Sequence, residues 1–310
     1  MGATPNWRSA AATDPGRLRT ENQDRTLAND DLGVFLVVDG LGGHAAGEKA
    51  AETAVEVIQS ELAARNGDMS HSIRSAIAAA NNRICDLAEQ HEAWHGMACV
   101  LTLAVVDGDK VCVGHVGDSR LYLVWNGVIR KLTSDHSPVG EREDRGELTE
   151  QEAMSHPRRH EVFRNVGSRR HEPGDSEFVE MKEFLFKPDA ALLLCSDGLS
   201  DLITAAEMNE IIERYDGDPE KTASALVNAA NDAGGKDNIS AIFVAGSEFV
   251  GIYSPAMTEA RARHSITRRR EETAETSPGI MHRIGRILIS RVAFLVYGFA
   301  IGVVLALAWR

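Results

Sequence analysis

The sequence has 310 residues, of which 43% are hydrophobic and 25% charged, a composition typical of a globular protein with a substantial core. The formal net charge is -13. Residues 259–310 hold nine Arg and four Glu, a local +5, so residues 1–258 carry -18. An acidic body of this kind argues against nucleic acid as a partner, because binding the phosphate backbone needs clustered Lys and Arg.

The first 247 residues predict a short tail followed by one α+β domain. We expect residues 1–13 to be a flexible tail and residues 14–247 to form the domain, with no signal peptide, because no charged region precedes an apolar core. Apolar runs predict strands at 33–38, 100–106, 110–116, 120–125, 127–132, 176–186, 191–196 and 240–246. The strands 110–116, 120–125 and 127–132 are separated by short turns, which favours an antiparallel meander.

Helical patterns alternate with these strands. Residues 45–64 and 70–90 predict two long helices, the second with Ile73, Ile77, Ile84 and Leu87 on one face. Two further helices begin with the capping boxes Thr149/Glu152 and Thr204/Glu207, and another spans residues 218–233. Strands in antiparallel runs with paired helices favour α+β layers.

The C-terminal part differs in composition. Residues 248–286 are rich in Ser, Thr, Arg and Glu and predict a basic juxtamembrane linker. Residues 292–309 carry no charge and would span roughly 27 Å as a helix, close to the thickness of a bilayer core. We therefore expect a transmembrane helix at 287–309. The preceding arginines place the acidic body in the cytoplasm of a single-pass protein of the inner membrane.

A glycine cluster follows the first predicted strand, in LVVDGLGGHAAGEKAA (Leu36–Ala51). A Walker loop would need Lys directly after the second glycine of the Gly42/Gly47 pair, but Glu48 stands there. A Rossmann fingerprint would need a third glycine where Ala45 stands. Both nucleotide interpretations fail, and the stretch is better explained as a turn that presents Asp39.

Asp39 is one of four aspartates at the ends of apolar strands. The others are Asp118 in VGDSR, Asp197 in CSDG and Asp237 in GGKDN. Carboxylates without His or Cys favour hard cations such as Mg²⁺ or Mn²⁺. Two such ions about 3.5–4 Å apart can activate water for in-line attack on phosphorus. Each Asp-Gly alone is a common turn, but four at strand ends favour a metal site.

The four cysteines (Cys85, Cys99, Cys112 and Cys195) lie beside aliphatic residues and have no zinc-site spacing. We expect them to be buried and reduced. Cys195 lacks a Cys-x5-Arg cradle, which argues against a cysteine mechanism.

Six ordered motifs resemble the metal-dependent protein phosphatases of the phosphatase 2C type, in their bacterial form. They are DPGRLRTENQD (14–24), VVDGLGGHAAGE (37–48), GHVGDSRLYL (114–123), LTSDHS (132–137), CSDGLSD (195–201) and GGKDNIS (234–240). The resemblance covers about residues 12–246. It implies two antiparallel sheets between pairs of helices, and hydrolysis of phosphoserine and phosphothreonine by a water that bridges two Mn²⁺ or Mg²⁺ ions.

The resemblance also implies roles for individual residues. Asp39 matches the carboxylate that bridges both metals, and Gly40 the residue whose carbonyl joins the first. Asp197 and Asp237 match ligands of the second metal, and Arg19 matches the arginine that binds the substrate phosphate. Two further roles complete the set: Asp24 matches an acid that holds metal-bound water, and Asp118 a ligand of a third, weaker metal. The segment 138–174 resembles a flap beside the active site.

Some positions depart from the family pattern, and other functions remain open. Leu41 stands where some members have a catalytic His; nearby His44 is either that general acid or a helix-start residue packed on the sheet. The main alternative is a catalytically weak module that binds phosphoproteins. An aspartyl-phosphate mechanism would need Asp two positions before Asp39, where Val37 stands. The expected partners are phosphorylated proteins, a membrane Ser/Thr kinase, and lipid at the C-terminal helix.

Overall fold

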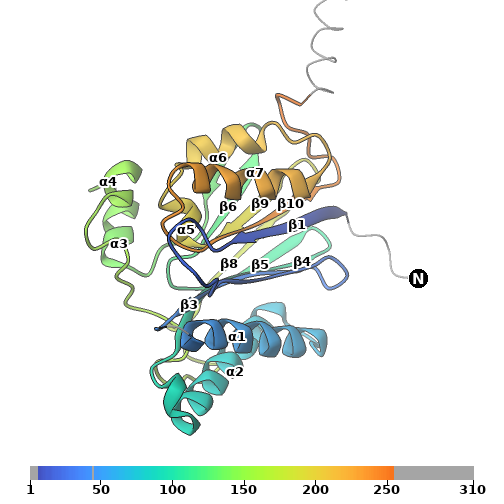
Figure 1. Ribbon diagram of the computed structural model, residues 1–310. Coiled ribbons are helices and arrows are strands. Elements are labelled where there is room, and N and C mark those ends of the chain that lie inside the picture. Colours follow the sequence, from blue (N-terminus) through green and yellow to red (C-terminus); the bar gives the residue numbers. More distant parts are fainter. Residues whose placement is uncertain (1–5, 44, 255–310) are drawn as a thin grey trace, which may run out of the picture. The chain divides into compact units, whose positions relative to one another are not determined.

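The computed structural model describes residues 6–43 and 45–254. In this part of the chain two five-stranded sheets face each other, and helices cover the outer face of each (Figure 1). The strands are β1 (Trp7–Asp14), β2 (Arg25–Asn29), β3 (Val34–Leu41), β4 (Ala98–Asp107), β5 (Lys110–Val116), β6 (Arg120–Trp125), β7 (Val128–Lys131), β8 (Glu180–Leu185), β9 (Ala191–Cys195) and β10 (Ile239–Gly246). The helices are α1 (Ala45–Ala63), α2 (Met69–Gln90), α3 (Pro138–Asp144), α4 (Glu150–Met154), α5 (Asp197–Ser200), α6 (Ala205–Ile212) and α7 (Pro219–Asp232), with a 3₁₀ turn η1 (Glu92–Trp94).

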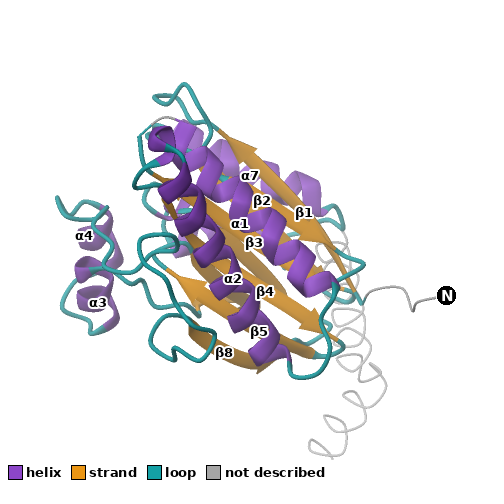
Figure 2. Ribbon diagram, turned by 90° about the horizontal axis from the view of Figure 1, so that it is seen from below, coloured by secondary structure: helices purple, strands orange, loops and turns teal. Residues whose placement is uncertain are grey.

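Every strand pair is antiparallel, as predicted for the α+β class. One sheet has the order β1-β10-β9-β6-β7 and the other β2-β3-β4-β5-β8. Helices α1 and α2 lie across the second sheet, and α6 and α7 cover the first (Figures 1 and 2). The layers are therefore helix, sheet, sheet and helix. The predicted strand 176–186 is shorter than expected, because β8 begins only at Glu180.

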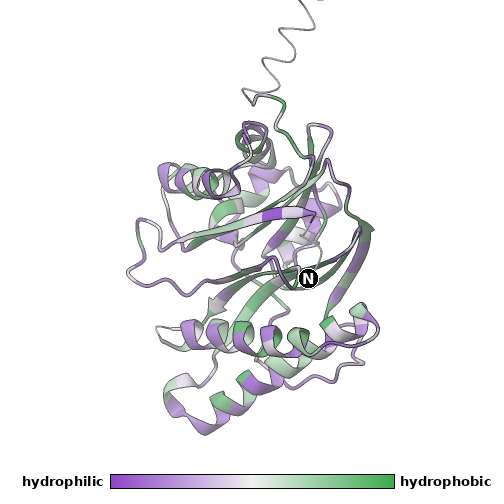
Figure 3. Cartoon of the chain, turned by 90° about the vertical axis from the view of Figure 1, so that its right-hand side faces the viewer, coloured by the Kyte–Doolittle hydropathy of each residue, from purple (hydrophilic) through white to green (hydrophobic). Residues whose placement is uncertain are grey.

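Apolar residues fill the spaces between the layers. Phe35 and Val37 of β3 face the opposite sheet, whereas Leu36 and Val38 face the layer of α1 and α2. Both faces of β3 are thus buried, which explains its continuous apolar run. Figure 3 shows hydrophobic residues concentrated in the strands, while the helices contain both hydrophobic and hydrophilic residues. Each fully buried large aliphatic side chain contributes about 1.5–3 kcal/mol to folding.

The helix predictions are confirmed where the local signals are strong. In α2, Ile73, Ile77, Ile84 and Leu87 are all buried, and the Asp68 side chain accepts a hydrogen bond from the backbone N of His71 at the N-terminus. Both capping boxes form, at the start of α4 and of α6. These features depend on residues three or four apart, so the sequence alone predicts them.

The predicted tail is wrong from Trp7 onward. Residues 7–14 form β1, which pairs along its whole length with β10, from Trp7 opposite Gly246 to Asp14 opposite Ile239. The Ala-rich segment has no clear strand pattern of its own. It is ordered by main-chain pairing with a strand from the other end of the domain. Such a distant partner cannot be predicted from neighbouring residues in the sequence.

The predicted meander is only half correct. Strands β6 and β7 form a hairpin, but β5 pairs with β4 and β8 in the other sheet. The turn between β5 and β6 therefore carries the chain from one sheet to the other. Gly117 makes this crossing with a φ of +110°, and a Cβ there would lie 2.2 Å from the Val100 side chain. Only glycine fits such a turn without strain.

The domain also extends beyond the predicted boundary at 247, as far as Ser254. Phe249 is buried in the cluster under α6 and α7. The Glu213 carboxylate accepts a hydrogen bond from the backbone N of Ile252 at 2.7 Å. Residues 248–254 therefore belong to the domain and not to the predicted linker.

The rest of that linker and the predicted transmembrane helix at 287–309 lie outside the described residues. Between residues 6 and 254, His44 apart, no helix combines the length and the apolar character needed to cross a bilayer.

Candidate active site

The four predicted aspartates meet at one edge of the two sheets. β3 reaches this edge at Asp39, β9 ends there just before Asp197, and β10 begins there just after Asp237. The turn that crosses between the sheets brings Asp118 to the same edge. All four line a cavity of about 390 Å³. Its wall also contains Arg19 and Gly40, and three ionisable side chains that the sequence did not single out: His160, Asp201 and Lys236.

Gly40 stands where β3 passes the start of α1. A Cβ on this residue would lie 2.2 Å from the backbone oxygen of Gly47, closer than any real Cβ contact. Glycine is required here because the two backbones touch. The close approach leaves the Gly40 backbone in the cavity wall next to Asp39, the place where the sequence predicts a carbonyl ligand.

Asp24 lies behind the cavity wall and is almost fully buried. Ser196 Oγ donates a hydrogen bond to Asp24 Oδ2 at 2.8 Å. The other carboxylate oxygen of Asp24, Oδ1, is buried and has no hydrogen-bond partner among the described residues. Burial raises the pKa of Asp24 to about 7, and the charges of Asp197 and Asp237 add to the effect. Asp24 is thus a carboxylate that lacks part of its solvation.

The cavity carboxylates disfavour one another's ionisation. Burial raises the pKa of Asp39 well above its ordinary value, and the charges of Asp24, Asp197 and Asp118 raise it further. Burial and the charge of Asp197 likewise raise the pKa of Asp118 to about 8. So many carboxylates in one half-buried cavity would repel each other at neutral pH unless cations lay among them.

Asp197 is the exception. Burial raises its pKa, but the neighbouring His160 and the charge of Arg159 outweigh burial, so the pKa lies below the ordinary value. His160 Nδ1 lies 3.8 Å from Asp197 Oδ2 and 3.9 Å from Asp201 Oδ2. Contact with Asp197 raises the pKa of His160 in turn. One ligand atom from each of these three residues lies within 4.8 Å of the others, a spacing that a cation can bridge.

Asp201 is the carboxylate that sequence reasoning missed. It follows Asp197 by four residues, one turn along α5, and burial raises its pKa to about 7. The signal was present in DGLSD, because residues four apart on a helix share a face. His160 and Lys236 had no such signal, because only the tertiary fold brings the segments that carry them to the cavity.

Arg19 stands at the rim of the cavity, and its Nη2 donates to Asp237 Oδ2 at 2.8 Å. Asn238 holds the Arg19 loop in place. Its Nδ2 donates to the backbone oxygens of Pro15 at 3.0 Å and Glu21 at 2.8 Å, and its Oδ1 accepts from the backbone N of Gln23 at 2.9 Å. The Arg19 side chain is 56% exposed, so it is free to meet a ligand.

The predicted flap is tied to the cavity through Arg159, whose side chain is only 2% exposed. Arg159 Nε lies 2.6 Å from Asp201 Oδ1, and Nη1 lies 3.5 Å from Asp118 Oδ2. A third ion pair joins Nη2 to Asp135 Oδ2 at 3.5 Å. Helices α3 and α4 themselves stand beside the sheets and not over them (Figure 1).

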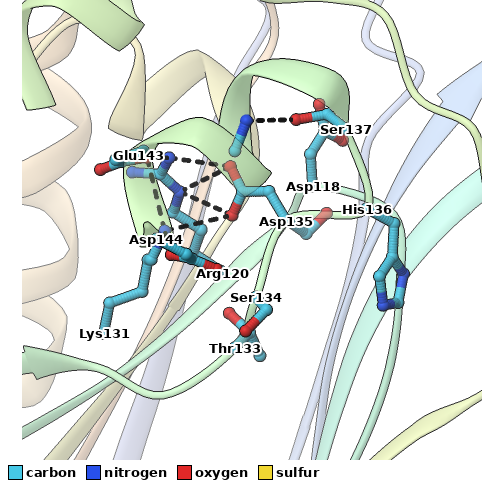
Figure 4. A network of polar contacts seen from close by, with 12 residues as sticks. Asp118, Arg120, Lys131, Thr133, Ser134, Asp135, His136, Ser137, Glu143 and Asp144 are labelled. Atoms are coloured by element: carbon cyan, nitrogen blue, oxygen red, sulfur yellow. Dashed lines mark hydrogen bonds and ion pairs between the residues drawn. The ribbon is translucent and has the colours of Figure 1, made fainter. Parts of the chain in front are cut away.

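A second buried arginine holds α3 against the body. Arg120 of β6 donates to Asp135 from Nε at 3.0 Å and from Nη2 at 2.8 Å, and to Glu143 of α3 at 2.8 Å (Figure 4). Lys131 Nζ adds an ion pair with Asp144 at 2.9 Å. The guanidinium charges hold the pKa of Asp135 far below its ordinary value despite burial.

Two buried histidines outside the cavity, His115 and His136, have structural partners. His115 is fully buried, its Nδ1 lies 2.9 Å from Thr102 Oγ1, and burial lowers its pKa to about 4. The nearby His136 Nδ1 accepts a hydrogen bond from the backbone N of Gly117 at 2.9 Å. These contacts agree with a structural role for His115. His44 lies outside the described residues.

The cysteines offer no nucleophile. All four are buried and free, as expected. Burial raises the pKa of the Cys195 thiol to about 12, so the thiolate is absent at neutral pH.

The donor chemistry of the cavity suits hard divalent cations. Its wall contains five aspartates beside the Gly40 backbone, and oxygen ligands of this kind are the ones that Mg²⁺ and Mn²⁺ prefer. The raised carboxyl pKa values and the unsatisfied Asp24 Oδ1 indicate a site that gains stability when cations balance its charge. The residues therefore fit a metal centre.

Comparison with known proteins identifies the family. The serine/threonine phosphatase stp of Listeria monocytogenes is 35% identical over 242 residues, which are 75% of this chain and 93% of that protein. The crystal structure of the Mycobacterium tuberculosis serine/threonine phosphatase PstP/Ppp matches with a TM-score of 0.70 at 29% identity, over 77% of this chain and 98% of that one. A PstP catalytic domain in complex with two manganese ions matches with a TM-score of 0.68 at 28% identity, over 77% and 97% of the two chains. Residues 17–231 match the family model described as protein phosphatase 2C, and the chain belongs to this family of metal-dependent serine/threonine phosphatases.

Proposed function

We propose that the acidic cavity is the catalytic centre and that it hydrolyses phosphoserine and phosphothreonine on proteins with Mn²⁺ or Mg²⁺. The observation that carries this proposal is the meeting of carboxylates from four separate segments in one cavity with Arg19 at its rim. Relatives named serine/threonine phosphatases support the reaction class. The two manganese ions bound by one of them support the choice of metal.

We infer the metal ligands from the resemblance to the family, and the cavity that most of them line supports the assignment. Asp39 and the Gly40 carbonyl would hold one ion, and Asp39, Asp197 and Asp237 the other. Asp118 would serve a third ion, for which Asp201 is a further candidate ligand. Asp24, behind the wall, would act through water. When bound, such ions activate water and neutralise charge on the phosphoryl oxygens.

Arg19 supplies the protein's own contact to the substrate. A guanidinium presents two parallel N–H groups, which match two oxygens of a phosphoryl group. Its ion pair with Asp237 is exposed and therefore weak, so a dianionic phosphate can compete for it. Asn238 keeps the loop of Arg19 fixed to the segment before β10, so Arg19 need not be ordered on binding.

A direct assay tests this function. The full chain should release phosphate from a phosphothreonine peptide with Mn²⁺ and lose that activity with a chelator. Asp39→Asn should lose most activity, whereas Asp107→Asn, which changes an exposed aspartate of β4, should keep it. Equal turnover with metal and with chelator would overturn the proposal.

We further propose that residues 287–309 anchor the chain in the inner membrane, with the catalytic domain in the cytoplasm. The uncharged run at 292–309 and the preceding arginines support this. An enzyme held there would act on phosphoproteins near the membrane, and a membrane Ser/Thr kinase is the partner we expect. Arg268–Arg270 would add attraction to anionic lipid of about 1 kcal/mol per residue near the surface.

Cell fractionation tests the anchor. The full chain should sediment with membranes and resist extraction by salt, and a chain ending at residue 286 should not. A full chain that stays in the supernatant without detergent would contradict the anchor and leave the catalytic proposal untouched.

A further inference from the structure

Lys236 is a cation in the wall of the catalytic cavity with a role still to be explained. It precedes Asp237 and its side chain is exposed. The same wall carries five carboxylates: Asp39, Asp118, Asp197, Asp201 and Asp237. Yet across residues 6–43 and 45–254 no ion pair or side-chain hydrogen bond of Lys236 is found.

Asp237, the residue next to Lys236, is paired with other groups. Oδ2 accepts from Arg19 Nη2 at 2.8 Å, and Oδ1 accepts from the backbone N of Asn238 at 2.8 Å. Some other lysines of the domain do have acidic neighbours: Lys131 lies 2.9 Å from Asp144, and Lys182 lies 2.7 Å from Glu180. A cation without a partner at the rim of an acidic cavity is available to an anionic ligand.

The loops that carry Arg19 and Lys236 are locked together. Arg17 N donates to the backbone oxygen of Gly235 at 2.7 Å. A Cβ on Gly16 would lie 2.2 Å from the backbone oxygen of Asp237, and Gly16 has a φ of +82°. The two backbones are in direct contact, so the side chains of Arg19 and Lys236 are attached to one rigid part of the rim.

We propose that Lys236 binds the phosphoryl group of the substrate together with Arg19. The inference rests on the proposed function and adds a second anion-binding side chain to it. Arg19 contributes an oriented pair of donors, whereas the Lys236 ammonium contributes a compact charge on a flexible stem. A contact of this kind stabilises the bound substrate and the transition state alike, so it lowers KM more than it raises kcat.

A neighbouring cavity indicates why the phosphoryl group, and not a flanking side chain, is the ligand of Lys236. This second cavity, of about 300 Å³, shares Arg19, Gln23, Gly42 and Asn238 with the first. It is also lined by Thr20 and Glu21, but not by Lys236. A polypeptide whose phosphorylated residue enters the catalytic cavity can therefore leave past Arg19 and away from Lys236.

The test compares the full chain with three variants, Lys236→Met, Lys236→Arg and Lys236→Glu. Lys110→Met is the matched control, because Lys110 is also exposed but begins β5, at the opposite end of that strand from the Asp118 turn. Steady-state kinetics with Mn²⁺ use p-nitrophenyl phosphate and two phosphothreonine peptides, with and without acidic flanking residues. Calorimetry measures the affinity of the Mn²⁺-loaded protein for inorganic phosphate, which does not depend on turnover.

We expect Lys236→Met to raise KM about three- to tenfold on all three substrates, with kcat nearly unchanged. This is the loss expected when one partly exposed hydrogen bond between charged groups is removed. The affinity for phosphate should fall by a similar factor, Lys236→Arg should restore most of it, and Lys236→Glu should be worse than Lys236→Met. Values for Lys236→Met that match Lys110→Met would overturn the proposal. So would a loss confined to the acidic peptide, which would make a side chain the ligand. A wild-type chain without turnover would instead contradict the proposed function itself.

Discussion

Arg19 Nη2 lies 2.8 Å from Asp237 Oδ2, although one residue follows the first strand of the domain and the other precedes the last. The pairing of β1 with β10 brings these two ends together. As a result, the side chain proposed to bind the phosphate and a proposed metal ligand share one rim. A change at Arg19 should therefore affect substrate binding without disturbing the fold.

Replacing Arg19 by Ala should lower kcat/KM on a phosphothreonine peptide about 10- to 100-fold, because a charged, two-donor contact to phosphate is lost. The melting temperature should change little, since the ion pair with Asp237 is exposed. Arg19→Lys should recover only part of the activity, because an ammonium lacks the paired donors. A Lys variant as active as the wild type would contradict the two-donor contact.

Replacing Gly40 by Ala should destabilise the protein by about 2 kcal/mol or more and reduce activity, because the new Cβ would collide with the Gly47 backbone. Gly43→Ala is the matched control, because a Cβ at Gly43 meets nothing within 4 Å. Urea unfolding and phosphatase assays measure both effects. Equal stability of the two variants would show that the close contact is not needed.

Replacing Arg120 by Ala should cost about 3 kcal/mol, because the buried Asp135 would lose its two-donor cation and keep only longer ion pairs, with Arg159 at 3.5 Å and Lys131 at 3.8 Å. Arg170→Ala removes the same kind of double ion pair, with Asp86 and Glu89, but from an exposed site, and should cost at most about 1 kcal/mol. Denaturant unfolding of both variants gives the comparison. Similar losses would mean that burial does not decide the strength of these pairs.

The metal-free protein should lose stability as the pH rises through the range from about 4 to 8. Folding raises the pKa of Asp118 from 3.8 to about 8, so the folded state holds a proton that the unfolded chain releases. The favourable contribution is complete below the unfolded pKa and is lost as the pH approaches the folded one. Asp118→Asn should therefore raise the melting temperature of the metal-free protein more near pH 8 than near pH 5.

Two controls accompany that measurement. Asp107→Asn, at an exposed position, should show no such pH dependence. Saturating Mn²⁺ should stabilise the wild type, by about 2.7 kcal/mol at a hundredfold excess over the dissociation constant, and more at high pH than at low pH. A gain from Asp118→Asn that is the same at both pH values would contradict carboxylate repulsion as its cause.

Local patterns predicted much of the fold and four of the five carboxylates in the cavity wall. The faces of α2, both capping boxes and the strand-end aspartates depend on neighbours within a few residues, so the order of side chains was enough to find them. Strand β1 and the change of sheet after β5 depend instead on partners far along the chain, and the predictions failed at both places.

The sequence by itself determined which carboxylates stand at strand ends and therefore the kind of cation chemistry they suit. Only the tertiary structure decided that Asp201, His160 and Lys236 share their cavity and that Arg159 of the flap contacts Asp118 and Asp201. The reason is physical. A local pattern follows from backbone geometry over a few residues, whereas a cavity is formed by segments that meet only after both sheets have packed.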